Sequence, residues 1–217
     1  MKTDSQLQRD VSAELQWEPS IRAEHIGVEV KDGVVTLAGQ VDSYIEKCNA
    51  ERAAQRVSGV HAMATELKVQ LPDDSQRSDA AIAGAAQQVL DLTSSVPTNA
   101  VKVLVENGWI SLTGTVDWHY QRRAAAAAVR HLTGVIGVSD KIALKPWLTA
   151  SAVRSDIEAA LMRSSISDAR KITVRLHGAE VTLAGTVNSW ADRAIATNSA
   201  WGTPGVSSVV DKLSLAY

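Results

Sequence analysis

The stretch GVVTLAGQVDSY at residues 33–44 returns twice along the chain, as GWISLTGTVDWH at 108–119 and as GAEVTLAGTVNSW at 178–190. The last glycine of each stretch, at 39, 114 and 185, is followed 20 residues later by a Gly-Val pair. The copies are therefore 75 and then 71 residues apart. A fixed period of this size indicates a fold built from repeated units.

Each quoted stretch predicts the second half of a β-hairpin. Apolar residues alternate with polar or small ones before and after the turn, which is typical of half-buried strands. Asp32-Gly33 and Asn107-Gly108 are dipeptides that accept the positive φ of a two-residue hairpin turn. In the third copy His177-Gly178 takes this place. We expect that third turn to be one residue longer.

A helix is predicted before each hairpin, because apolar residues recur there at every fourth position. The three helices are expected at 5–17, 80–92 and 151–163, with caps near Thr3, Ser78 and Thr149. A second, alanine-rich helix follows each hairpin. It is expected to start after Asp42, Asp117 or Asn188, with Ser43 to Glu46 and Ser189 to Asp192 as alternative capping boxes.

A last strand follows the Gly-Val pair in each copy, so the unit reads αββαβ. A strand, helix, strand succession favours a parallel crossover. The predicted fold class is α+β, with three tandem units that each have a small three-stranded mixed sheet covered on one face by two helices. The expected units are 1–72, 76–146 and 149–217. Six predicted structural glycines recur in this pattern: Gly39, Gly114, Gly185, Gly59, Gly134 and Gly205.

Composition limits the classes of function. The 22 Lys plus Arg and 24 Asp plus Glu give a net charge of -2, so we expect no nucleic-acid partner. Cys48 has no partner for a disulfide, and the five histidines show no zinc spacing, so no metal or cofactor is expected. The sequence shows no signal peptide or apolar span. We expect a cytoplasmic protein, with peripheral attachment to the inner membrane as an alternative.

The repeated motif resembles the BON domain, a bacterial osmotic-stress and nodulation domain. All three copies carry the G-x-V segment, a basic residue early in the second helix (Lys47, Arg122 and Arg193) and the step to Gly-Val. Asp140-Lys141-Ile142 and Asp211-Lys212-Leu213 fit its last-strand motif. The resemblance implies a transport-associated protein that binds anionic phospholipid or envelope components during osmotic stress.

No constellation of residues predicts catalysis. A catalyst needs a base, a nucleophile or a metal that converge in a pocket, and the repeated polar positions here are helix caps and cations. The paired glycines belong to hairpins and do not open a helix, so a phosphate-binding loop is not expected either. We therefore expect a protein that is not an enzyme.

One candidate binding surface lies on the uncovered sheet face of the second copy. Strand alternation places Trp109 and Leu104 on this face, where the other copies have more polar residues. An exposed apolar pair requires cover. A protein contact, with a neighbouring unit or a second chain, is favoured over a lipid or another ligand. The alternative function is accordingly a protein-interaction or chaperone-like scaffold.

A second candidate surface is the head of the second helix in the same copy, with Trp118, His119, Tyr120, Arg122 and Arg123. Amphipathic rings beside cations suit an anionic membrane surface. The second copy has 7 basic and 5 acidic residues over 76–147, whereas the first has 8 and 13 over 1–75. The competing interpretation is that Arg122 covers the edge of the core. The sequence leaves the ligand and the oligomeric state open.

Overall fold

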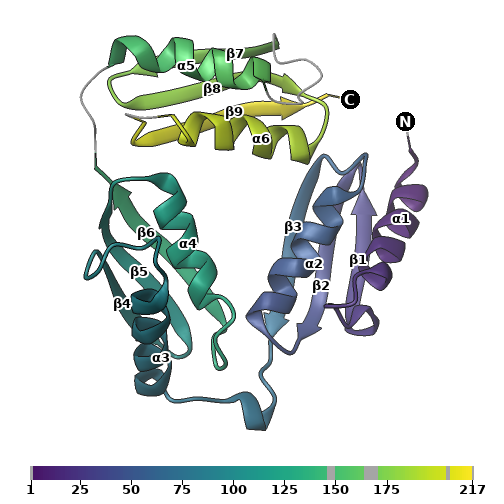
Figure 1. The fold of residues 1–217 in the computed structure, drawn as a ribbon. Helices are drawn as coiled ribbons and strands as arrows, with labels where there is room; N and C mark the ends of the chain where they lie inside the picture. The colour runs from purple at the N-terminus through teal and green to yellow at the C-terminus, as the bar shows by residue number, and fades with distance from the viewer. Residues whose placement is uncertain (1, 146–149, 164–170, 204–205, 217) are drawn as a thin grey trace. The chain divides into compact units, whose positions relative to one another are not determined.

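A computed structural model of the chain describes residues 2–145, 150–163, 171–203 and 206–216, and three sheets of three strands each organise them (Figure 1). The prediction of an α+β fold with three repeats is confirmed. The helices are α1 (Asp4–Trp17), α2 (Tyr44–Arg56), α3 (Asp79–Leu92), α4 (His119–Val129), α5 (Ala150–Arg163) and α6 (Trp190–Trp201). Short 3-10 turns are η1 (Ala23–His25) and η2 (Asp73–Ser75). The strands are β1 (Ile26–Lys31), β2 (Val34–Val41), β3 (Ala62–Val69), β4 (Val101–Glu106), β5 (Trp109–Val116), β6 (Gly137–Leu144), β7 (Ile172–His177), β8 (Glu180–Val187) and β9 (Ser208–Leu215).

The hairpin strand in the middle of each sheet has one outer strand on either side, in the orders β1-β2-β3, β4-β5-β6 and β7-β8-β9. In the first sheet β1 is antiparallel to β2, and β2 is parallel to β3. The third sheet has the same arrangement. The parallel pairing requires a crossover, which α2 and α6 supply. The predicted mixed sheet is confirmed in both repeats.

The helices of the first repeat pack on one face of their sheet. Leu7, Val11 and Leu15 of α1 are buried in one cluster with Val35 and Leu37 of β2. The alanines of α2 complete this cluster, and their small side chains allow the helix to lie close to the strands. The alternate side chains of β2 therefore lie on the other, uncovered face.

The N-termini of the second helices follow the alternative capping prediction. Ser43 caps α2, and Ser189 caps α6, each by accepting a hydrogen bond from the N–H three residues later. The second repeat has Trp118 at this position. There the side chain of Gln121 accepts hydrogen bonds from the N–H groups of Asp117 and Trp118, at 3.0 Å each.

The hairpin turn of the third repeat differs from the prediction. His177 pairs with Glu180, so the loop between them has two residues, as in the first repeat, where Lys31 pairs with Val34. The expected extra residue is wrong, since the turn residues are Gly178 and Ala179. Gly178 has φ 61° at the first turn position, where a type II′ turn places glycine.

Trp17, at the end of α1, does not pack into the core. Its side chain is 84% exposed. Helical periodicity places positions 7, 11 and 15 on the buried stripe, and position 17 falls outside it. Trp147 and the cap expected at Thr149 lie outside the described residues.

Candidate functional site

Three of the repeated glycines occupy one strained backbone position. Gly39, Gly114 and Gly185 have φ values of 135°, 136° and 131°. A Cβ atom at each would lie 2.0 to 2.1 Å from the carbonyl oxygen of the residue before the first strand of its sheet. Only glycine fits such a close approach of two backbones. These residues therefore shape the hairpin.

The second set of glycines follows the second helix. Gly59 and Gly134 have φ values of 101° and 93°, where glycine has the least strain. Gly205 lies outside the described residues.

Arg122 and Arg193 each join their helix to the last strand of the same sheet. Nε of Arg122 lies 2.7 Å from Oδ2 of Asp140, and Nε of Arg193 lies 2.7 Å from Oδ2 of Asp211. In each pair the arginine side chain is 28% exposed and the aspartate 26%. The second carboxylate oxygen accepts a hydrogen bond from the N–H two residues later, at 3.0 and 2.9 Å. We call these contacts the Arg–Asp clasps.

The first repeat has a weaker version of the clasp, because Thr65 stands at the position of the aspartate. Nζ of Lys47 instead donates to the backbone carbonyl of Leu67, at 3.0 Å. All three basic residues thus hold the last strand of their own repeat. These contacts support the interpretation that Arg122 covers the core edge, and a role of the three cations in binding stays a prediction.

The head of α4 presents one ring and one cation. Tyr120 is 58% exposed, and the side chain of Arg123 is exposed, whereas Trp118 and His119 are partly buried. Burial lowers the pKa of His119 to about 4, and the positive charges of Arg122 and Arg123 act in the same direction. His119 is therefore neutral at pH 7. Tyr120 and Arg123 are the members of this predicted group that solvent reaches best.

A cation and a ring also meet in the third repeat. The guanidinium carbon of Arg193 lies 5.1 Å from the centre of the Trp190 ring, within cation–π range. Arg193 therefore combines its clasp with a ring contact.

The uncovered sheet face of the second repeat carries the predicted pair. Leu104 is 57% exposed and Trp109 is 46% exposed. Nε1 of Trp109 donates to Oγ of Ser139 at 2.9 Å, and the indole covers Gly137 so closely that a Cβ there would lie 2.3 Å from the ring. Trp109 is thus held against β6 within its own sheet. Leu104 is the more exposed of the two.

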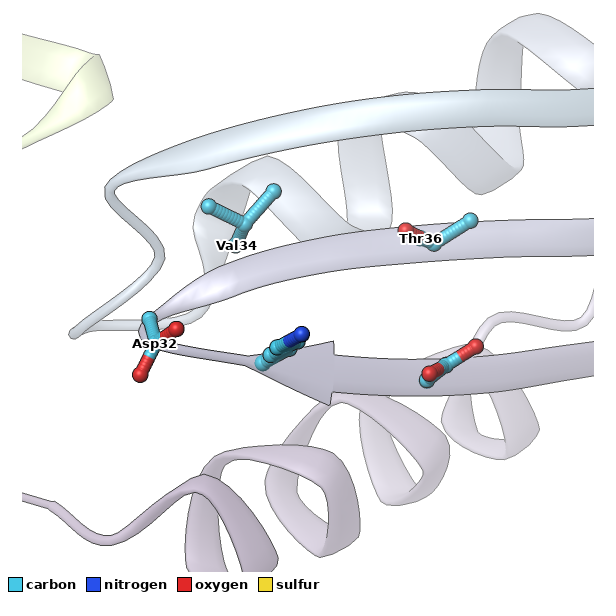
Figure 2. A pocket seen from close by; sticks show the side chains of 5 residues that line it. Asp32, Val34 and Thr36 are labelled. Carbon is cyan, nitrogen blue, oxygen red and sulfur yellow. The ribbon is translucent and has the colours of Figure 1, made fainter.

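The same face of the first repeat has a shallow hollow of about 320 Å³ (Figure 2). Five residues line it: Glu29, Lys31, Asp32, Val34 and Thr36. Figure 2 shows Val34 and Thr36 along β2 and Asp32 in the turn. Two carboxylates against one ammonium group disfavour an anionic ligand in this hollow.

The sequence analysis missed a contact between the first helix and the hairpin turn. Both carboxylate oxygens of Asp79 accept hydrogen bonds at 2.8 Å, from the N–H groups of Asn107 and Gly108. Asp4 does the same in the first repeat, at 2.8 and 3.1 Å. The available signal was an aspartate 28 residues before the turn in two of the copies.

The capping-box prediction included Glu46, but the burial of its carboxylate was not predicted. Glu46 is only 6% exposed and accepts hydrogen bonds from the N–H groups of Arg22 and Asp42, at 2.7 and 2.9 Å. Both bonds tie backbone segments to the start of α2. The role of Glu46 is therefore structural.

The described residues contain no group of three or more His, Cys, Asp or Glu that is placed to bind a metal ion. Among the same residues, no helix combines the length and the apolar character that crossing a membrane requires.

Comparison with known proteins supports the repeat pattern. A family model described as the BON domain matches three times, at residues 3–70, 78–146 and 149–217. Osmotically-inducible protein Y of Escherichia coli (strain K12) is 29% identical over 148 residues, which cover 65% of this chain and 73% of that protein.

Two solved structures of CdsD, a structural protein of the type III secretion system of Chlamydia trachomatis, were also matched. One is 15% identical, with 96% of this chain and 91% of that chain covered. The other, of the C-terminal domain, is 16% identical and covers both chains fully. Both have a TM-score of 0.27, and at this value neither likeness supports a conclusion.

Proposed function

The chain belongs to the BON domain family, and we propose that it is a non-enzymatic protein that binds anionic phospholipid surfaces during osmotic stress. The name of the Escherichia coli relative, osmotically-inducible protein Y, supports the stress context. The resemblance of the repeated motif to BON domains supports anionic phospholipid as the ligand.

The observation that carries the proposal is the exposure of Tyr120 and Arg123 together at the head of α4. A tyrosine ring suits the depth of the lipid headgroups, and each basic residue near an anionic surface contributes about 1 kcal/mol. The second repeat has two more basic than acidic residues over 76–147 (7 against 5), whereas the first has five more acidic ones over 1–75 (13 against 8). The net charge of the second repeat therefore favours contact with an anionic membrane, and that of the first repeat opposes it.

The test is co-sedimentation of the full chain with phosphatidylglycerol vesicles, with phosphatidylcholine vesicles for comparison. Binding to phosphatidylglycerol alone is expected, and it should weaken as salt screens the charges. Tyr120→Ser/Arg123→Glu should reduce this binding about tenfold or more. The matched control is Arg52→Glu, which makes the same charge change at an exposed arginine of α2. Equal binding to both vesicles, or equal loss in the control, would exclude the proposed site.

A second candidate function is a protein-interaction scaffold. It is favoured by the exposure of Leu104 on the uncovered sheet face of the second repeat, which also carries Trp109. Contacts of this apolar face should persist at high salt, in contrast to the lipid contact. If vesicles fail to bind at any salt concentration, suppression of the aggregation of a heat-unfolded model enzyme tests the scaffold. Trp109→Ser should abolish that suppression.

A further inference from the structure

We propose that the chain dimerises through the outer strand β4 of the second repeat, which pairs antiparallel with β4 of a second copy about Leu104. β4 lies at one side of its sheet, where the order is β4-β5-β6 (Figure 1). The outer edge of such a strand has unpaired N–H and C=O groups, and it pairs with another strand unless it is protected.

The first repeat shows which backbone groups face outward. Nε2 of Gln8 in α1 donates to the carbonyl of Val28, at 2.7 Å, so this carbonyl points away from β2. The N–H and C=O groups of one residue point to the same side of a strand, and alternate residues share that side. Val28 corresponds to Val103 in the second repeat, 75 residues later. The outward groups of β4 are therefore those of its valines.

The second repeat lacks the side chain that protects this edge. The residue at the position of Gln8 is Ala83, which has no hydrogen-bonding group. Ala83 therefore cannot make the hydrogen bond that Gln8 makes to the first strand of its own repeat. The methyl group of Ala83 also leaves room beside the strand. The outer edge of β4 is thus open to a partner.

The sequence of β4, VKVLVE, is complementary to itself when two copies run antiparallel about Leu104. Lys102 then lies opposite Glu106 of the partner subunit, and the two Leu104 side chains face each other. All three side chains are exposed. Because the valines form the hydrogen-bonded pairs, Leu104 and the charged residues occupy the non-hydrogen-bonded pairs, where side chains approach most closely. The pairing buries Leu104, which is 57% exposed in the single chain.

The equivalent outer strands of the other repeats lack this complementarity. The same pairing of β1 places Glu29 opposite Glu29 of the partner subunit, and that of β7 places Arg175 opposite Arg175 of the partner subunit. Like charges directly opposite each other destabilise a strand pair. The comparison selects the second repeat for dimerisation.

The outer strands on the other side of the sheets are protected. In β6 and β9 the aspartate of the Arg–Asp clasp already bonds one outward N–H. In β3 the ammonium group of Lys47 binds an outward carbonyl. An N–H group makes one hydrogen bond, so a clasped strand has lost a donor that pairing requires. β4 is therefore the edge that best suits a second copy.

Sedimentation equilibrium of the full chain over a range of concentrations tests the proposal. The wild type should form dimers, and Lys102→Glu should weaken the dimer roughly tenfold, because glutamates then face each other in two symmetric pairs. Glu106→Lys should weaken it equally, through facing lysines. An equimolar mixture of these two variants should associate again, since each glutamate then meets a lysine. This recovery also shows that both variants are folded.

The matched control is Lys31→Glu, an equal charge change at an exposed position of β1, and it should leave the dimer unchanged. A direct probe is Leu104→Cys in a Cys48→Ser background, which should form a disulfide between subunits on mild oxidation, because facing residues of this kind lie within disulfide range. A wild type that remains monomeric at all concentrations overturns the proposal. So does a dimer that tolerates Lys102→Glu, or a mixture that fails to associate.

Discussion

Removing the carboxylate of Asp140 should loosen the last strand of the second repeat. Its two oxygens hold Nε of Arg122 at 2.7 Å and the N–H of Ile142 at 3.0 Å. A partly buried, charge-assisted pair contributes about 1 kcal/mol, and so does a typical backbone hydrogen bond. The expected loss for Asp140→Ala is therefore about 2 kcal/mol, whereas Asp140→Asn retains an acceptor for Ile142 and should lose about 1 kcal/mol.

Hydrogen exchange of the β6 amides measures this loss locally, which is necessary because a chain of three repeats need not unfold in one step. A loss of about 2 kcal/mol corresponds to roughly 30-fold faster exchange. Asp211 has the same geometry in the third repeat, so Asp211→Asn should accelerate exchange in β9 as much as Asp140→Asn does in β6.

A double-mutant cycle isolates the ion pair. Arg122→Ala and Asp140→Ala should show a coupling free energy of about 1 kcal/mol. Vesicle binding by Asp140→Asn should equal that of the wild type, because Arg123 remains in place. A coupling free energy near zero would refute the clasp, and loss of vesicle binding in Asp140→Asn would show that Arg122 has a direct part in the membrane contact.

Two further changes test the hairpin of the second repeat. Gly114→Ala should destabilise the repeat by about 3 kcal/mol, because Gly114 has φ 136° and an added Cβ would lie 2.0 Å from a carbonyl oxygen. The control is Gly84→Ala, where an added Cβ has no atom within 4 Å, and this change should stabilise α3 by about 1 kcal/mol. Thermal unfolding followed by circular dichroism compares the two, and an equal effect would contradict the glycine argument. Asp79→Ala should remove two hydrogen bonds to the turn and accelerate hydrogen exchange at Asn107 and Gly108 about tenfold, while unchanged exchange would exclude this contact.

Much of the fold was predictable because the same sequence pattern occurs three times along the chain. Comparison of the three copies distinguishes the alternating pattern of the strands from the longer period of the helices. The dipeptides Asp32-Gly33 and Asn107-Gly108 mark two of the turns. The third turn was predicted wrongly, since aligning Gly178 with the glycine of the other turns introduced an extra residue. Strand pairing shows that Ala179 takes that position.

The candidate site was predictable only in part. Periodicity placed Trp109 and Leu104 on the uncovered sheet face, and their exposure agrees with this. The partners of Arg122 and Asp79 lie 18 and 28 residues away, and no local pattern relates such positions. The sequence also could not distinguish the clasped Arg122 from the exposed Arg123, because neighbours on a helix point in different directions.

The sequence by itself determined the number of repeats, the order of their elements and the face that each strand buries. These depend on local conformational preference and on hydrophobic periodicity, which act over a few residues. Tertiary structure alone decided which polar groups meet: Asp140 with Arg122, Asp79 with the turn, and Gln8 with the outer strand β1. Such pairs form only after the chain has brought distant segments together, since hydrogen bonds and ion pairs require contact within about 3 Å.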